Sequence, residues 1–225
     1  DHGSSETFKQ LQELSGSLTK LADQAIKKDM AGKGELRRLA NSIKMLIRVE
    51  QEGNDVEVVS HEATHQVAAN TGLFPRNVRI PRWVHEGLAA YFESPNNGAW
   101  SGIGAVNEQR LTFYRALERD REHSNIDFIV GDQVFDYAGS IGAMLHGYGQ
   151  AWAFTHFLIE KHFDEFIRYY KELGDMPPDV TLGPEMLTTL FNRAFGTDRG
   201  ALDSEWRAYM RSLKTDTEVI LAEGK

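Results

Sequence analysis

Apolar residues recur at every third or fourth position along most of this chain, as they do on one face of an amphipathic helix. The pattern predicts a helix over residues 5–30 and a second helix from about residue 35 to residue 50. The glycines of residues 31–34 separate the two helices, and Gly53–Asn54 ends the second. Residues 1–54 are therefore expected to form an N-terminal helical hairpin, for which a dimerisation arm is the alternative.

A third helical pattern begins at Asp55, which is a suitable cap for a helix that ends near Asn70. Its apolar residues are spaced at helical intervals and predict a buried stripe made of Val56, Val59, Ala63 and Val67. The alternative is a short strand over residues 56–59 that leads into a helix capped by Ser60.

The remaining residues are also mainly helical in pattern. Helices are expected over residues 81–93, from Asn107 to about residue 121, over residues 146–162, 164–173 and 184–195, and after Thr197 or Asp198. Residues 94–106 are rich in turn formers and either line a cleft or form a plain surface loop. Residues 126–140 predict a short helix and a loop.

These patterns indicate a mainly α-helical fold with little or no β-sheet. The expected organisation is the hairpin over residues 1–54, a main domain over residues 55–213, and a frayed C-terminal tail over residues 214–225. A chain of 225 residues that is 41% hydrophobic is long enough for one substantial core with an appendage.

Composition narrows the functions that fit this fold. The net charge of −8 argues against nucleic acid or an anionic membrane as a partner. The absence of cysteine excludes disulfides and thiolate metal sites, and no apolar run is long enough for a membrane span. The chain begins at Asp1 without an initiator methionine, so we expect a removed targeting segment and an extracytoplasmic setting, secreted or periplasmic.

The most informative stretch is His61-Glu62-Ala63-Thr64-His65, which contains the pattern H-E-x-x-H. On a helix the two histidines lie one turn apart on the same face, so both can bind one metal ion. Glu62 lies about 100° around the helix, where it is better placed to deprotonate a water than to act as a third ligand. The alternative is a surface helix with two solvated histidines.

A third ligand is expected from the helix over residues 81–93. Glu86 lies in its first turns, and the linker over residues 70–75 turns the chain so that two antiparallel helices can bring Glu86 to the histidines. His85 competes for this role, but helix neighbours point in different directions, so only one of the two can face the metal. Glu93 is either an acceptor for a ligand histidine N–H or a solvated helix end.

Beyond these residues, the chain resembles a known group of enzymes. H-E-x-x-H followed by Glu86-Gly87-Leu88-Ala89-Ala90-Tyr91 is similar to the gluzincin branch of zinc metallopeptidases. With residues 70–73, 83–93, 102–107 and 148–158, the chain resembles a bacterial family of unknown function, DUF1570, which is grouped with gluzincin-like peptidases. The resemblance runs from about Val56 to Met210. It implies a zincin-like catalytic domain and a Zn²⁺ ion held by His61, His65 and Glu86, and it favours Glu86 over His85.

The expected function is hydrolysis of a peptide or protein substrate by a zinc-activated water, with Glu62 as the general base. Peptide hydrolysis also needs a donor for the oxyanion, and gluzincin relatives often take a Tyr or His from a later helix. Tyr148 is the candidate, followed by His146 and His156; the alternative for Tyr148 is a core aromatic residue.

Two other functions remain open from the sequence. The first is a zinc-binding but inactive domain that acts as a binding or scaffolding module, in which His85 or His146 supplies a fourth ligand. The second is a metal-free helical interaction protein. Gluzincins generally place a sheet before the zinc helix, whereas this chain has no clear strands, so it departs from that pattern or lacks its upstream part.

Overall fold

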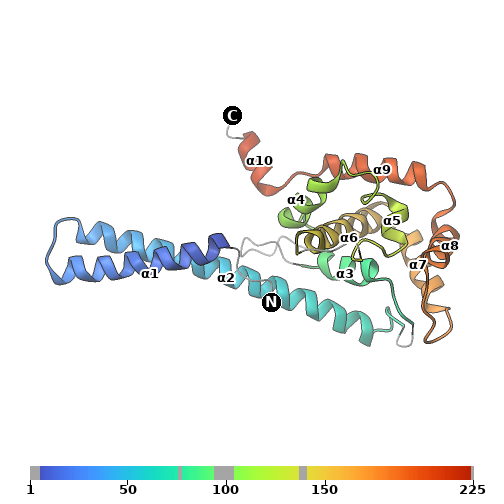
Figure 1. The fold of residues 1–225 in the computed structure, drawn as a ribbon, viewed down its shortest axis with the longest axis horizontal. Coiled ribbons are helices and arrows are strands. Elements are labelled where there is room, and N and C mark those ends of the chain that lie inside the picture. Colours follow the sequence, from blue (N-terminus) through green and yellow to red (C-terminus); the bar gives the residue numbers. More distant parts are fainter. Residues whose placement is uncertain (1–5, 76–77, 94–103, 137–140, 224–225) are drawn as a thin grey trace. The chain divides into compact units, whose positions relative to one another are not determined.

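The computed structural model describes residues 6–75, 78–93, 104–136 and 141–223 (Figure 1). Over these residues every regular element is a helix and no strand occurs, so the mainly helical fold is confirmed. The chain divides into two compact units, the first built on residues 1–55 and the second on residues 56–95 and 100–225. No helix in the described part of the chain combines the length and apolar character that a membrane span requires.

The first unit contains α1 (Glu6–Lys27) and the beginning of α2 (Lys33–Asn70). The chain reverses between them at the predicted break, where Asp29 and Gly32 adopt positive φ angles of 50° and 78°. An ion pair between Arg37 and Asp23 joins the two helices. The described residues buried in this unit are mostly small, which lets the helices approach closely: Ser15, Ala22, Ala25, Ala40, Ile47 and Gly53.

The second helix does not end at Gly53–Asn54, as its sequence predicts. α2 is one continuous helix of 38 residues, so the predicted break and the alternative strand over residues 56–59 are both wrong. One interior glycine costs a helix only about 1 kcal/mol relative to alanine, which long flanking helical segments can offset. The other end was predicted correctly, because α2 stops at Asn70 and Gly72 follows with φ of 79°.

The buried face of α2 is the opposite of the predicted one. Val56, Val59 and Val67 are 50%, 67% and 60% exposed, and Ala63 is exposed as well. The face turned inward carries Glu57 and Ala68, with the half-buried His61 and His65 between them. Polar groups can be buried where they find polar partners, and here Glu86 of α3 (Arg82–Tyr91) contacts His61 and Arg110 of α4 (Glu108–Leu117) contacts Glu57.

The second unit is built around α6 (Ile141–Lys161), in which every residue from 151 to 158 is buried. α3 (Arg82–Tyr91), α4 (Glu108–Leu117), α7 (Phe163–Gly174) and α9 (Arg199–Ser212) all pack on it (Figure 1). Glycines allow the closest approaches. A Cβ atom on Gly87 of α3 would lie 2.6 Å from the Ala151 carbonyl oxygen of α6. One on Gly149 of α6 would lie 2.9 Å from the Tyr114 nitrogen of α4.

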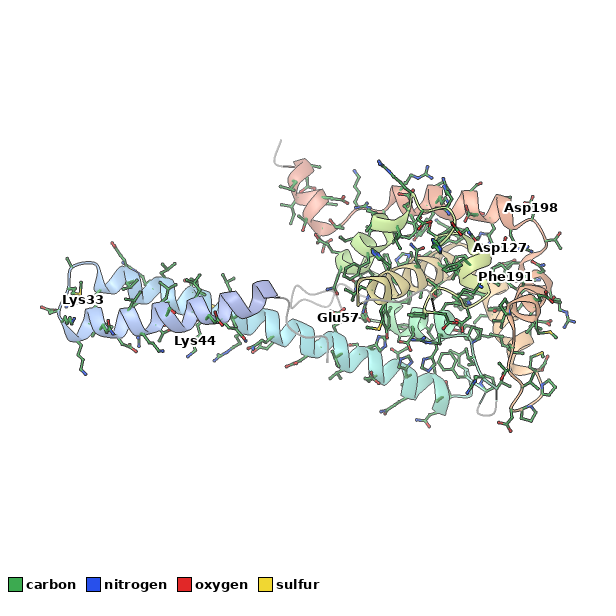
Figure 2. The ribbon with its side chains drawn as sticks, viewed as in Figure 1. Lys33, Lys44, Glu57, Asp127, Phe191 and Asp198 are labelled. Carbon is green, nitrogen blue, oxygen red and sulfur yellow. The ribbon has the colours of Figure 1, made fainter. Side chains whose placement is uncertain are left out.

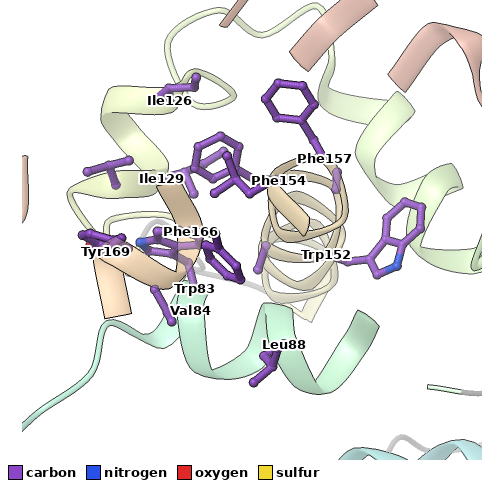
Figure 3. Close-up of a cluster of buried hydrophobic side chains, with 14 of the residues drawn as sticks. Trp83, Val84, Leu88, Ile126, Ile129, Trp152, Phe154, Phe157, Phe166 and Tyr169 are labelled. Atoms are coloured by element: carbon purple, nitrogen blue, oxygen red, sulfur yellow. The ribbon is translucent and has the colours of Figure 1, made fainter. Parts of the chain in front are cut away.

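Large aromatic and aliphatic side chains fill the core of the second unit. Trp83 of α3 and Phe154 of α6 point into one cluster with Ile129 of α5 (Ile126–Val130) and Phe166 of α7 (Figure 3). The ring centroids of Trp83 and Phe154 are 5.2 Å apart. α8 (Pro184–Phe195) adds Phe191, whose centroid is 6.0 Å from that of Phe154. The core therefore fixes α3, one of the two helices that carry the candidate ligands, against α6.

Capping residues set several helix ends. Asn107 and Asp198 accept hydrogen bonds from the backbone N–H groups of Arg110 and Ala201, as their sequence positions predict (Asp198 is labelled in Figure 2). The start of α3 is capped from a distance, because both oxygens of Asp132 accept bonds from the backbone N–H groups of Arg82 and Trp83. No local pattern indicates such a contact.

The tail predicted over residues 214–225 contains a helix over its described residues. Asp216–Glu223 forms α10, and Thr215 and Glu218 cap it reciprocally, each side chain accepting a bond from the other's backbone N–H. Arg115 of α4 binds Glu218 at 2.7 Å and so ties α10 to α4.

Candidate metal centre

The three predicted ligands lie close together in the second unit. His61 and His65 come from α2 and Glu86 from α3, and their ligand atoms all lie within 4.8 Å of one another. The His61 Nε2 atom is 3.1 Å from His65 Nε2 and 3.2 Å from Glu86 Oε2. His65 Nε2 is 3.8 Å from the same Glu86 oxygen. The helical spacing of the histidines and the turn into α3 thus bring these three groups together.

The triangle of donor atoms has the dimensions of a tetrahedral zinc site. Bonds of about 2.0–2.1 Å to imidazole nitrogen and carboxylate oxygen place neighbouring ligand atoms about 3.3 Å apart in a tetrahedron. The three observed separations of 3.1, 3.2 and 3.8 Å bracket this value. Two imidazoles and one carboxylate also form a donor set that zinc binds readily. The residues present therefore fit a zinc ion.

Glu93 holds the ring of His61. Its Oε1 atom lies 2.8 Å from His61 Nδ1, and only 1% of its side chain is exposed. The alternative of a solvated helix end is therefore wrong. When the His61 proton is on Nδ1, the Nδ1–H group donates a hydrogen bond to Glu93, and the lone pair of Nε2 points towards His65 and Glu86.

His65 is held in a different way. Its Nδ1 atom is buried without a hydrogen-bond partner among the described residues. The ring instead stacks on His85, with centroids 3.8 Å apart and planes inclined by 10°. His85 Nδ1 lies 3.3 Å from Glu86 Oε1, so His85 touches a candidate ligand without joining the group of three donors. The carboxylate of Glu86, and not the ring of His85, therefore lies with the Nε2 atoms of His61 and His65.

The two predicted catalytic residues flank this group differently. Glu62 is exposed on α2, next in sequence to His61. Tyr148 of α6 is half-buried, and its ring centroid is 6.3 Å from that of His61. Burial and the neighbouring Glu86 carboxylate raise the pKa of the Tyr148 phenol. Tyr148 therefore keeps its proton at neutral pH and can donate it in a hydrogen bond.

The two other oxyanion candidates form hydrogen bonds with residues outside the group of three ligands. His146 Nδ1 is 3.1 Å from the backbone oxygen of Phe113. His156 is buried, with Nε2 3.1 Å from the Gly104 oxygen and Nδ1 2.9 Å from the Tyr209 hydroxyl. Both rings are engaged in packing contacts of α6. The predicted cleft-lining loop over residues 94–106 lies outside the described residues except for its last three.

Sequence reasoning missed a buried ionic network behind the ligands. Arg110 of α4 forms two hydrogen bonds with Glu93, and its Nη2 atom lies 3.7 Å from Glu57 Oε1 (Glu57 is labelled in Figure 2). Glu57 shares a helix face with His61 and His65, since these residues are four positions apart, and this spacing was an available signal. Arg110 precedes the inward-facing Tyr114 by one helical turn, and this spacing was a weaker signal.

The site favours positive charge. Burial alone lowers the pKa of His61, but its hydrogen bonds with Glu86 and Glu93 raise that pKa to about 9. Burial acts to raise the pKa of Glu86, and the hydrogen bonds from His61 and His85 hold it well below its usual range. Burial, followed by His85, lowers the pKa of His65. The Glu86 carboxylate therefore lies where the Nε2 atoms of the two histidines meet, and the Glu93 carboxylate lies at His61 Nδ1, so both favour a bound cation.

Comparison with known proteins gives one match. The family model described as "Protein of unknown function (DUF1570)" matches residues 55–179, a range that includes His61, His65, Glu86 and Tyr148. No curated protein and no solved structure matches the chain.

Proposed function

The chain belongs to the DUF1570 family of proteins of unknown function, and we propose that it is a zinc-dependent metallopeptidase of the gluzincin type. The observation that carries the proposal is the convergence of His61, His65 and Glu86 next to the exposed Glu62. Catalytic zinc sites have three protein ligands and keep one position for water or substrate, whereas structural sites have four. Among the described residues, no fourth His, Asp or Glu joins this group.

In this proposal, the chain's own residues have separate roles in hydrolysis. A bound zinc ion supplies Lewis acidity, which activates a water molecule and polarises the scissile carbonyl. Glu62 accepts a proton from the attacking water and returns it to the nitrogen of the leaving amine, so it acts first as base and then as acid. Tyr148 donates a hydrogen bond to the carbonyl oxygen as it gains negative charge. A peptide or protein is the substrate class that this chemistry suits.

The test of this proposal is Glu62→Gln. The variant keeps the shape of the side chain and removes its basicity, so kcat/KM on a fluorogenic peptide library should fall by at least about 100-fold. Zinc content, measured by elemental analysis, should stay at the wild-type value because Glu62 is not a ligand. Glu52→Gln, an exposed position on the same helix, is the matched control and should keep full activity. Retained turnover in Glu62→Gln would rule out the mechanism.

A second candidate function is a zinc-binding but inactive module that binds a partner protein. It is favoured by the exposed valines of α2, Val56, Val59 and Val67, and by the absence of a strand among the described residues that could pair with an extended peptide. Wild-type protein that carries zinc and cleaves no member of the library would favour this second function over the first.

A further inference from the structure

Arg110 is a buried cation whose geometry is fixed by two bonds. Its side chain is 9% exposed, its Nε atom donates to Glu93 Oε2 at 2.9 Å, and its Nη2 atom donates to Glu93 Oε1 at 2.7 Å. Such a two-pronged contact fixes the plane of both groups, which a single charged contact does not. The position of Glu93 is therefore set by α4, an element that supplies none of the three candidate ligands.

Glu93 passes this constraint on to His61. Its Oε1 atom contacts both Arg110 and His61 Nδ1, and its Oε2 atom also accepts from Asn107 Nδ2 at 3.2 Å. With both oxygens engaged, the carboxylate cannot rotate without breaking a contact. The ring of His61 is accordingly held at the angle at which Nε2 faces His65 and Glu86.

The start of α4 is itself locked in place. Asn107 caps the helix through Oδ1, which accepts from the Arg110 backbone N–H at 3.0 Å, while its Nδ2 group binds Glu93. A Cβ atom on Gly149 of α6 would lie 3.1 Å from the Arg110 carbonyl oxygen, so the backbone of Arg110 touches α6 directly beside Tyr148. The Arg110 guanidinium also lies 5.2 Å from the centre of the Tyr148 ring.

We propose that Arg110 is the positioning residue of the metal centre, aligning His61 through Glu93 and holding the Tyr148 ring beside it. The inference rests on the proposed function, because it takes His61 to be a metal ligand. Arg110 touches no ligand itself; it acts through Glu93. Carboxylates and other groups that orient a metal-binding histidine typically change metal affinity by about 10–100-fold when they are replaced. Arg110 should have an effect of this order.

The chain contains a matched control for this role. Arg207 of α9 is also buried and also binds a carboxylate, with Nε 2.6 Å from Asp203 Oδ2. Its Nη2 atom also donates to Asp203 Oδ1 at 3.2 Å, and further hydrogen bonds go to the backbone oxygens of Glu118 and Ser124. Arg207 thus resembles Arg110 in burial and charge pairing, but its hydrogen bonds go to Asp203, Glu118 and Ser124 and not to Glu93. Replacing each arginine by lysine keeps the charge and removes the two-pronged geometry.

The experiment compares Arg110→Lys and Arg207→Lys in the full chain. Zinc affinity is measured by competition with a chelator, and the coordination geometry by the visible absorption spectrum of the cobalt-loaded protein. We expect Arg110→Lys to raise the zinc dissociation constant about 10–100-fold and to change the cobalt spectrum. Arg207→Lys should lose comparable stability towards urea while its zinc affinity and cobalt spectrum match the wild type.

A third variant keeps the test independent of folding. Asn107→Ser preserves a capping side chain but removes the bond to Glu93, so it should weaken zinc binding less than Arg110→Lys does while leaving α4 intact. The inference would be overturned if a folded Arg110→Lys kept the zinc affinity and cobalt spectrum of the wild type. If Arg110→Lys does not fold, the same result in Asn107→Ser would overturn it. Either result would leave the proposed metal centre unaffected. A wild-type chain that binds no zinc would overturn the proposed function and the inference together.

Discussion

At the scale of single residues, the notable feature is that two acids share one arginine unequally. Burial, then the proximity of Glu93, raises the pKa of Glu57 to about 7, although Arg110 acts in the opposite direction. Burial also acts to raise the pKa of Glu93, but its hydrogen bonds with His61 and Arg110 lower it. The arginine therefore stabilises the charge of the carboxylate that it binds with two bonds, and Glu57, at 3.7 Å, remains the acid that takes up a proton.

This difference predicts a pH dependence of stability. The folded-state pKa of Glu57 lies above the ordinary glutamate pKa of 4.5, so its stabilising contribution is complete below about pH 4.5 and is lost as the pH rises through about 7. In chelator-treated protein, the free energy of unfolding of the wild type should fall relative to that of Glu57→Gln between about pH 5 and pH 8. The expected difference is on the order of 1–3 kcal/mol.

Urea unfolding at pH 5, 6, 7 and 8 measures this effect. Glu52→Gln removes the same charge from an exposed position of α2 and should follow the wild-type curve. Parallel curves for the wild type and Glu57→Gln would show that the proton is not taken up by Glu57.

At the scale of elements, the site depends on how closely α3 approaches α6. Gly87 follows the candidate ligand Glu86, and a Cβ atom there would meet Thr155 Oγ1 at 2.2 Å and the Ala151 carbonyl oxygen at 2.6 Å. The nearest backbone cannot yield without moving a helix. The glycine therefore sets the distance at which Glu86 is presented to the histidines of α2.

Two glycine-to-alanine changes with opposite effects test this packing. Gly87→Ala should destabilise the protein by about 1–3 kcal/mol through overpacking, and should also weaken zinc binding because α3 is displaced. Gly16→Ala lies in the interior of α1 with no atom near its Cβ position, and should stabilise its helix by roughly 0.5–1 kcal/mol. Urea unfolding, monitored by circular dichroism, measures the change in stability of each variant. Destabilisation of equal size in the two variants would contradict the packing argument.

At the scale of the whole molecule, each unit has its own buried residues. The large core cluster begins with Ala68 and contains no residue of the first unit, whose interior is the narrow seam of α1 and the beginning of α2. The three candidate ligands all belong to the second unit. Zinc should therefore stabilise the second unit and leave α1 unaffected.

Hydrogen exchange measured with and without zinc tests this expectation. At a zinc concentration 100 times the dissociation constant, the opening free energy of the most protected amides in α3, α4 and α6 should rise by about 2.7 kcal/mol. The amides of α1 should exchange at an unchanged rate, and Glu86→Ala should abolish the effect. An equal rise in the opening free energy of the α1 amides would mean that the two units unfold together.

The sequence by itself determined the features that depend on neighbours within a turn or two of helix. The mainly helical fold, the end of α2 at Asn70, the caps Asn107 and Asp198, and the one-turn spacing of His61 and His65 all follow from local periodicity and local hydrogen bonding. The approach of the Glu86 helix to the histidines was also anticipated, because a short linker limits where the next helix can lie, and the family resemblance favoured Glu86 over His85.

Only the tertiary structure decided which groups those helices would bury. The valines of α2 face outward and Glu57 faces inward, where it lies 3.7 Å from Arg110, an arginine that arrives from α4, far along the chain. The same holds for Asp132, which caps α3 from 50 positions away. Local periodicity measures how apolar a face is and carries no information about distant polar partners. The contacts of Arg110 with Glu93 and Glu57 behind His61 were therefore not predicted, although the spacing of Glu57, His61 and His65 was a signal for the burial of Glu57.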